Sequence, residues 1–245
     1  MAMITNLLFV LAFGLTVTTE VDLHKRIIGG RNCTAQERPY HVKFVHLSGS
    51  NRCGGSLISD RWILTAAHCW NDSIPMKAIL SPHPGPGQEA AFVQPPRFLN
   101  VGSGRPDIML LELEQTTTTP YISLPDCDKR RIQTGDVVQI AGYGSNQVGP
   151  LNQKIYGEVD VLQCANFTVE GNEPPTDTEY TTQVFRVNTD HKDTSPGDSG
   201  GGVVFDNAIY GVHKEGGNTA YTAKAAFADV CHYIDSIKQI MALHV

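Results

Sequence analysis

The sequence contains no long hydrophobic run and no run of like charges. Its most prominent apolar stretch, residues 7–17, is shorter than the ~20 residues that an α-helix needs to span a bilayer. The net charge is −6 over 245 residues. These absences argue against a membrane-spanning protein, against an electrostatic membrane anchor and against a nucleic-acid-binding protein.

Metal-binding patterns are also missing. No CxxC pair and no clustered His/Cys spacing occurs among the 6 cysteines and 9 histidines, so we expect no metal centre and no cofactor. No internal repeat is present. With 41% hydrophobic residues the chain can form a proper core, and its length fits one large all-β domain or two small ones.

The apolar run has the length of a signal-peptide core, although no Lys or Arg precedes it. We expect a signal peptide over 1–19, a short charged segment over 20–26 and the mature domain over 27–245. A buried N-terminal segment is the alternative. Export to the extracellular space fits three N-glycosylation sequons, at Asn32, Asn71 and Asn166.

Short apolar runs separated by turn residues favour strands. They cover 41–47, 136–144 and a hairpin over 201–205 and 208–212 with its turn at Asp206-Asn207. Many short strands with Gly/Pro turns are typical of a barrel or sandwich. The proline-rich residues 81–98 and the residues 171–183 are interpreted as surface loops. Helical spacing appears near the C-terminus, from Tyr233 to Met241.

Three segments carry residues for nucleophilic catalysis. The hexapeptide Gly197-Asp198-Ser199-Gly200-Gly201-Gly202 surrounds a serine with glycines, His68 lies in Ala66-Ala67-His68-Cys69, and Asp107 precedes an apolar strand. A serine needs a base, and the base needs an orienting acid. The alternatives are a Gly-rich hairpin without chemistry, a histidine with no catalytic role, and an acid in a simple turn.

These segments resemble the trypsin-like (chymotrypsin-fold) serine peptidases over about residues 27–240. The resemblance also rests on Ile27-Ile28-Gly29-Gly30 and on Cys53-Gly54-Gly55-Ser56-Leu57-Ile58. It implies an all-β fold of two six-stranded antiparallel β-barrels with a C-terminal α-helix. His68 and Asp107 would come from the first barrel and Ser199 from the second.

The resemblance assigns roles to these residues. His68 would be the general base, Asp107 its orienting acid and Ser199 the nucleophile, with the N–H groups of Gly197 and Ser199 as the oxyanion hole. An activating protease would cut Arg26-Ile27, and the new terminus would pair with Asp198. The expected partners are a protein or peptide substrate, the activating protease and protein inhibitors, and the expected state is a monomer.

The proposed substrate pocket departs from the family pattern. Asp193 stands where trypsins bind substrate Arg or Lys, although a chance acid in an Asp-rich loop is the alternative. Ser195 and Asn218 or its neighbours replace the usual cysteine brace. Glu215 in Lys214-Glu215-Gly216 replaces an aromatic residue, and either favours basic substrates or points to solvent. Further departures are Ala225 and Gly202, where glycine and proline are usual.

An even number of cysteines in an exported chain indicates disulfides. By resemblance Cys53 pairs with Cys69 and Cys127 with Cys231. Cys33 and Cys164 lack their usual partners, because the matching positions look like Tyr156 and Arg186, and they either join each other or stay free.

The sequence thus predicts a secreted serine endopeptidase that cleaves after Arg or Lys. A non-catalytic homologue that binds a partner protein is the alternative, and the altered pocket is its support.

Overall fold

The structure is a computed structural model that describes residues 27–47, 50–100, 104–174 and 180–243. The predicted signal peptide and activation segment, including Arg26, lie outside the described residues. No helix within the described ranges is both long and apolar enough to cross a membrane.

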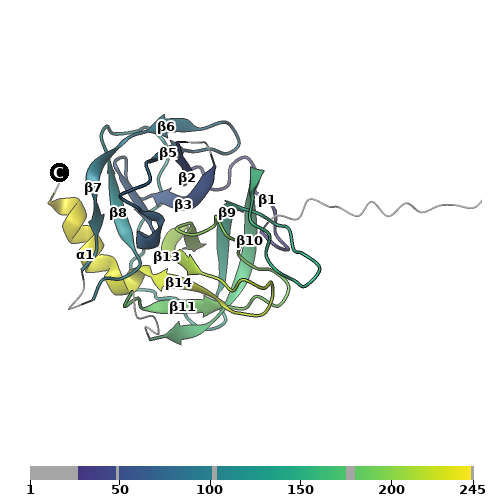
Figure 1. Ribbon diagram of the computed structural model, residues 1–245. Coiled ribbons are helices and arrows are strands. Elements are labelled where there is room, and N and C mark those ends of the chain that lie inside the picture. Colours follow the sequence, from purple (N-terminus) through teal and green to yellow (C-terminus); the bar gives the residue numbers. More distant parts are fainter. Residues whose placement is uncertain (1–26, 48–49, 101–103, 175–179, 244–245) are drawn as a thin grey trace, which may run out of the picture.

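The first half of the chain forms one antiparallel sheet. Its strands are β2 (His41–His46), β3 (Asn51–Leu57), β4 (Trp62–Thr65), β5 (Met76–Leu80), β6 (Gln88–Ala90), β7 (Phe92–Phe98) and β8 (Met109–Leu113). They are hydrogen-bonded in the order β6-β5-β2-β3-β4-β8-β7, and the sheet curls into a half-barrel in the upper part of Figure 1.

The second half of the chain forms a closed barrel, and the short N-terminal strand β1 (Arg31–Asn32) joins its sheet at one edge. The other strands of this sheet are β9 (Val137–Gly144), β10 (Glu158–Glu173), β11 (Val184–Val187), β12 (Gly202–Phe205), β13 (Ala208–Glu215) and β14 (Ala225–Asp229). The strands are ordered β1-β10-β11-β14-β13-β12-β9, and an additional β9–β10 pairing closes a ring from which β1 is left outside. The C-terminal helix α1 (Val230–Ala242) follows β14, so the predicted fold class is confirmed.

The apolar patterns explain the core of both halves. All residues of β4 and β8 are buried, because these two strands pair inside the curled sheet, between β3 and β7. The predicted hairpin is β12–β13, and its turn residues Asp206 and Asn207 have φ of 46° and 57°. Asp and Asn tolerate this left-handed region better than most residues, which explains the turn.

The prediction of a loop over 81–98 was wrong in part. Gln88–Ala90 and Phe92–Phe98 form β6 and β7 despite Pro95 and Pro96. The pairing of β7 with β8 is irregular between Val93 and Arg97, and this irregularity accommodates the two prolines, which have no N–H to donate. Within 171–183, β10 continues to Glu173 and residues 175–179 are outside the described part.

Residues 115–125 join the two barrels. Ile122 N–H donates to the Leu57 carbonyl at 3.0 Å, and Ile209 N–H donates to the Ser123 carbonyl at 3.0 Å. The Cys127–Cys231 disulfide then fastens the end of this strip to α1. The two barrels are therefore held in one arrangement at the strip and at the helix.

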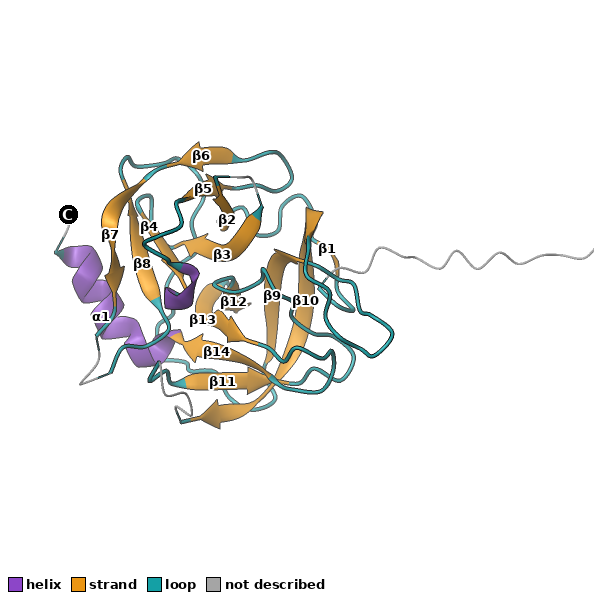
Figure 2. Cartoon of the chain, viewed as in Figure 1, coloured by secondary structure: helices purple, strands orange, loops and turns teal. Residues whose placement is uncertain are grey.

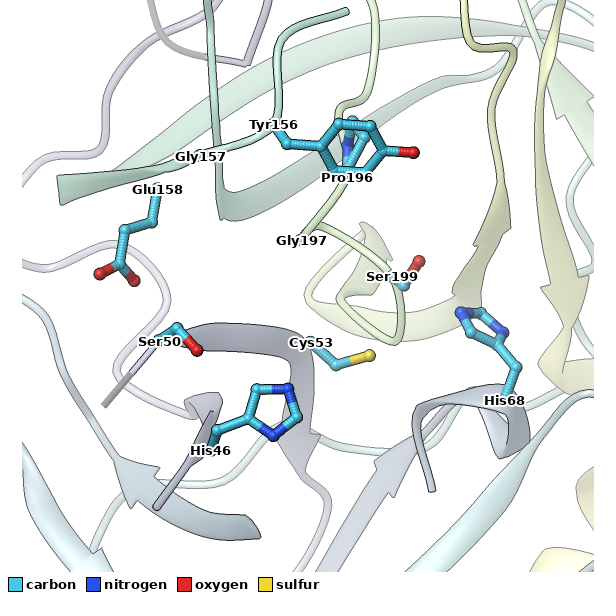
Figure 3. A pocket seen from close by; sticks show the side chains of 10 residues that line it. All are labelled: His46, Ser50, Cys53, His68, Tyr156, Gly157, Glu158, Pro196, Gly197 and Ser199. Carbon is cyan, nitrogen blue, oxygen red and sulfur yellow. The ribbon is translucent and has the colours of Figure 1, made fainter. Parts of the chain in front are cut away.

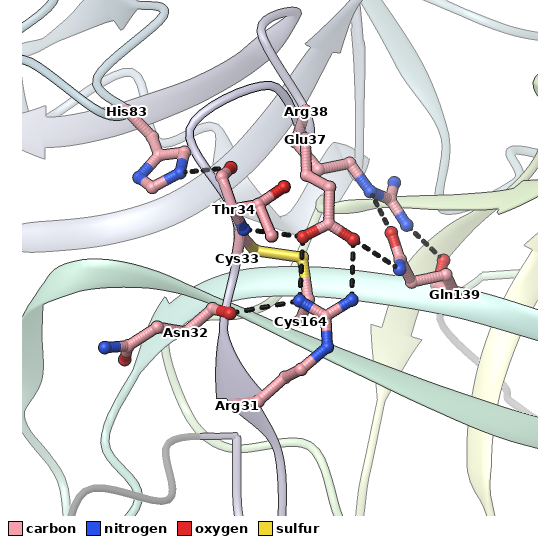
Figure 4. Close-up of polar contacts among 9 residues, drawn as sticks. All are labelled: Arg31, Asn32, Cys33, Thr34, Glu37, Arg38, His83, Gln139 and Cys164. Carbon is pink, nitrogen blue, oxygen red and sulfur yellow. Dashed lines mark hydrogen bonds and ion pairs between the residues drawn. A yellow bond between two sulfur atoms is a disulfide. The ribbon is translucent and has the colours of Figure 1, made fainter.

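The N-terminal segment is fastened to the second barrel (Figure 4). A disulfide joins Cys33 to Cys164, with an S–S distance of 2.05 Å, so these two cysteines pair and the free-thiol alternative was wrong. Beside it, Glu37 accepts two hydrogen bonds from Arg31, at 2.6 and 2.7 Å. These bonds to Arg31 hold the pKa of Glu37 down to about 2, against its burial.

Candidate active site

His68 lies in a short 3₁₀ helix, η1 (Ala67–Cys69), that follows the buried strand β4. Figure 2 shows this turn in purple near the centre of the molecule, where the two barrels meet. The predicted Cys53–Cys69 disulfide fastens η1 to β3. The His68 side chain keeps 33% of its surface exposed, so its ring is fixed at its base and accessible at its edge.

Asp107 is positioned to orient that ring. One carboxylate oxygen accepts the His68 backbone N–H at 2.8 Å, and the other lies 2.7 Å from Nδ1 of the same residue. The side chain of Asp107 is only 3% exposed, and its own backbone N–H donates to Thr182 Oγ1 at 2.8 Å. A buried carboxylate at Nδ1 favours the tautomer in which Nε2 is free to accept a proton.

Ser199 lies in the turn that precedes β12. Its carbonyl accepts the Gly54 N–H from β3 at 2.7 Å, which links this turn directly to the first barrel. On its other side the Gly200 N–H donates to the His213 carbonyl at 2.8 Å. Gly200 has a φ of 79°, and a Cβ there would lie 2.4 Å from the Gly54 carbonyl oxygen. The glycine is therefore required by both the conformation and the close approach of the two barrels.

His68 and Ser199 line one cleft of about 560 Å³. Figure 3 shows the His68 ring beside Ser199, with Gly197 on the opposite side of the serine. Cys53 and Tyr156 contribute further walls. His68 and Asp107 come from the curled sheet, and Ser199 lies in the turn before β12 of the closed barrel. The two halves of the chain therefore bring these three residues close together.

Asp198, the residue before Ser199, is completely buried. Its carboxylate accepts N–H groups from Gly144 at 2.7 Å and from Ser195 at 2.8 Å. Burial raises its pKa to about 6, against these two hydrogen bonds. A Cβ on Gly142 would lie 2.1 Å from the carboxylate, so the glycine makes room for it. The side chain of Ile27 is also fully buried.

Asp193 is paired inside the protein. Its carboxylate lies 2.9 Å from Lys154 Nζ, and the two side chains are 0% and 2% exposed. Its second oxygen accepts the Tyr221 N–H at 3.0 Å, and its own N–H donates to the Ile28 carbonyl. Burial raises the pKa of Asp193, although Lys154 acts in the opposite direction.

The other residues of the proposed pocket lie in different surroundings. Gly216 lies close to the ion pair, since a Cβ there would be 3.4 Å from Lys154 Nζ and 2.5 Å from Thr194 Oγ1. Ala225 is buried in β14. The side chain of Glu215 is half exposed and lies 3.1 Å from Lys214 Nζ. A carboxylate in this position can remain hydrated while it is paired.

The comparisons with known proteins bear on this geometry. A sequence model of the family described as Trypsin matches residues 27–237. The chain belongs to the trypsin-like serine peptidase family. Serine protease 1 of Canis lupus familiaris is 30% identical to the chain over 251 residues, and the alignment covers 96% of the chain and 98% of the relative. Trypsin I-P1 of Gallus gallus is 30% identical over 229 residues, covering 89% and 90%.

A solved structure of mouse neuropsin, titled a serine protease expressed in the limbic system of mouse brain, has the same fold. It is 22% identical, has a TM-score of 0.71 and aligns over 86% of this chain and 98% of the neuropsin chain. This likeness supports the architecture of two barrels and the C-terminal helix.

Sequence reasoning missed three buried residues of this trypsin-family site. Thr182 supports Asp107, Lys154 pairs with Asp193, and His213 places its Nε2 2.9 Å from Thr194 Oγ1. Burial, with smaller contributions from His68 and Lys154, lowers the pKa of His213 to about 3. None of the three carries a local sequence motif, because each reaches the site through tertiary contacts.

Two groups within the described residues bring three potential metal-ligand atoms together, Cys53 with His68 and Cys69, and Cys33 with Glu37 and Cys164. In each group both sulfurs are bonded to each other in a disulfide and are not thiolates.

The predicted glycosylation residues Asn32, Asn71 and Asn166 are all exposed.

Proposed function

We propose that the protein is a secreted serine endopeptidase whose catalytic residues are His68, Asp107 and Ser199. The observation that carries this proposal is the two-point contact of the buried Asp107 with His68, in the same cleft as Ser199. The family relatives support the class of reaction, since they include a serine protease and several trypsins.

The proposed chemistry follows from these positions. Ser199 Oγ attacks the carbonyl carbon of the scissile bond while His68 Nε2 takes its proton, and Asp107 stabilises the imidazolium. The Gly197 and Ser199 N–H groups hold the oxyanion, each worth about 3 kcal/mol in such sites. His68 then protonates the leaving amine, and water, activated by the same base, hydrolyses the acyl-enzyme.

We further propose that the chain is made as an inactive precursor. An activating protease would cut Arg26-Ile27, and the new ammonium of Ile27 would pair with Asp198. Two observations support this: the side chain of Ile27 is already fully buried, and Asp198 is a fully buried carboxylate that a cation would stabilise. The predicted segments 1–19 and 20–26, secretion and glycosylation belong to the same proposal.

The proposed specificity is cleavage after Arg or Lys of a protein or peptide substrate, with Asp193 as the acid that binds the cation. Asp193 is a buried carboxylate, and Gly216 of the proposed pocket lies close to it, since a Cβ there would be 3.8 Å from its Oδ1. Its internal pairing with Lys154 means that this specificity is achieved with low efficiency. The same observation favours the second candidate, a non-catalytic homologue that binds a partner protein.

A peptide library tests the proposal directly. The protein, cut at Arg26-Ile27, is incubated with the library, and Ser199→Ala serves as the matched control. We expect cleavage after Arg and Lys that the control lacks. Cleavage after aromatic or small residues would show that Asp193 does not bind the substrate side chain. No cleavage in either protein would favour the partner-binding homologue.

A further inference from the structure

The ion pair between Lys154 and Asp193 occupies the position that the proposed specificity leaves for a substrate. Its two charged groups are 2.9 Å apart, and their side chains are 2% and 0% exposed. A buried pair of this kind persists only where both charges are compensated, because each alone has a large desolvation cost. Asp193 is thus neutralised by a cation of the protein itself.

The loop that carries Lys154 is fastened to the segment that faces Asp193. The Lys154 N–H donates to the Asn218 carbonyl at 2.9 Å, and the Ala220 N–H donates to the Asn152 carbonyl at 2.7 Å. Neighbouring side chains of the loop point outward, since Leu151 is 84% and Tyr156 77% exposed. Lys154 therefore turns inward from a surface loop, and its long side chain could return to solvent without unfolding the barrel.

A chain of contacts connects this pair to the Ser199 turn. The Gly200 N–H donates to the His213 carbonyl, and the His213 ring is bonded to Thr194, the residue after Asp193. The described residues that line the Ser199 cleft include Pro196 and Gly197 but neither Asp193 nor Lys154. Neither residue of the ion pair therefore lines this cleft, and the Asp193 carboxylate is enclosed in the protein with Lys154 Nζ 2.9 Å from it.

We propose that Lys154 is a tethered competitor of the substrate cation, and that it is the residue that limits binding of Arg and Lys side chains at Asp193. This inference rests on the proposed specificity. One carboxylate cannot neutralise two buried cations, so a substrate guanidinium binds only in the fraction of molecules whose Lys154 has left. The apparent affinity falls by that fraction. A tethered group has a high effective concentration, so the open fraction is small.

The test uses benzamidine, an amidinium probe that needs no catalysis. Its dissociation constant is measured by calorimetry for the wild-type chain and for Lys154→Ala, Lys154→Gln and Lys192→Ala. Lys192 is the matched control, because it adjoins Asp193 in sequence but its Nζ donates to the Asn166 carbonyl outside the pair. We expect at least tenfold tighter binding in both Lys154 variants and no change in Lys192→Ala. Adding Asp193→Ser to Lys154→Gln should abolish the gain.

A second measurement uses the wild-type chain, so it does not depend on the folding of a variant. Amines are acetylated with an N-hydroxysuccinimide ester and the modified lysines are identified by mass spectrometry. We expect Lys154 to react slowly alone and faster as benzamidine is titrated in, with Lys224 unchanged. Unchanged labelling of Lys154 across the titration, or no gain of affinity in a folded Lys154 variant, would overturn the inference. A gain of affinity without hydrolysis of any arginine ester by the cut protein would instead overturn the proposed function and leave this inference standing.

Discussion

Asp198 gives the chain a pH dependence of stability that can be worked out from its surroundings. In the uncut protein its carboxylate is buried and accepts two backbone N–H groups, and burial raises its pKa from 3.8 to about 6. The native state therefore holds a proton that the unfolded state releases at lower pH. The stabilisation of the native state by protonated Asp198 is present below about pH 4 and is lost as the pH rises towards 6. At about 1.4 kcal/mol per pH unit, the loss is about 3 kcal/mol.

Other groups titrate in the same range, so the experiment isolates Asp198 by difference. Asp198→Asn keeps the shape of the protonated acid and does not titrate. The free energy of unfolding in urea is measured for the uncut wild type and this variant at pH 4, 5, 6 and 7, with the fluorescence of the 2 tryptophans as the signal. We expect the free energy of unfolding of the wild type minus that of the variant to fall by about 2.4 kcal/mol between pH 4 and 7, because part of the loss is already complete at pH 4.

Cutting at Arg26-Ile27 supplies the internal control. If the new ammonium reaches Asp198, the charged carboxylate gains a partner and the fall with pH disappears. The reasoning would be refuted if, in the uncut chain, the free energy of unfolding of the wild type minus that of the variant did not change with pH. That result would mean that the ionised form of Asp198 is compensated before cleavage.

Three further predictions concern activity. Trypsin treatment that cuts Arg26-Ile27 should raise ester hydrolysis from a low background, and equal rates in cut and uncut samples would exclude the precursor. Ser199→Ala and His68→Ala should each lower kcat by about 10⁴-fold or more, with the double variant little worse than either; losses that multiply would show two independent residues. Asp193→Ser should abolish the preference for Arg in a peptide library, whereas an unchanged profile would place substrate binding elsewhere.

Much of the fold follows from local patterns. The short apolar runs on either side of the turn at Asp206 and Asn207 predicted the β12–β13 hairpin, and the spacing from Tyr233 to Met241 predicted α1. Pro95 and Pro96 misled the prediction over 81–98, because the irregular pairing of β7 with the next strand, β8, accommodates both prolines and has no local sequence signal.

The proposed catalytic residues were predictable from the sequence, whereas the contents of the proposed substrate pocket were not. His68, Asp107 and Ser199 have recognisable neighbours, and the structure brings them to one region. The contents of the pocket had no such signal, because Lys154 reaches Asp193 from another loop and His213 reaches Thr194 from β13. The joining of Cys33 to Cys164 likewise depends on the pairing of β1 with β10, which places the two chain segments side by side.

The central claim is that Ser199 is an activated nucleophile, and a fluorophosphonate probe tests it most directly. The probe reacts with a serine only where a base removes the hydroxyl proton. We predict that the chain cut at Arg26-Ile27 is labelled on Ser199 alone, that Ser199→Ala is not labelled, and that His68→Ala is labelled far more slowly. A cut, folded wild-type chain that the probe does not label would contradict the account.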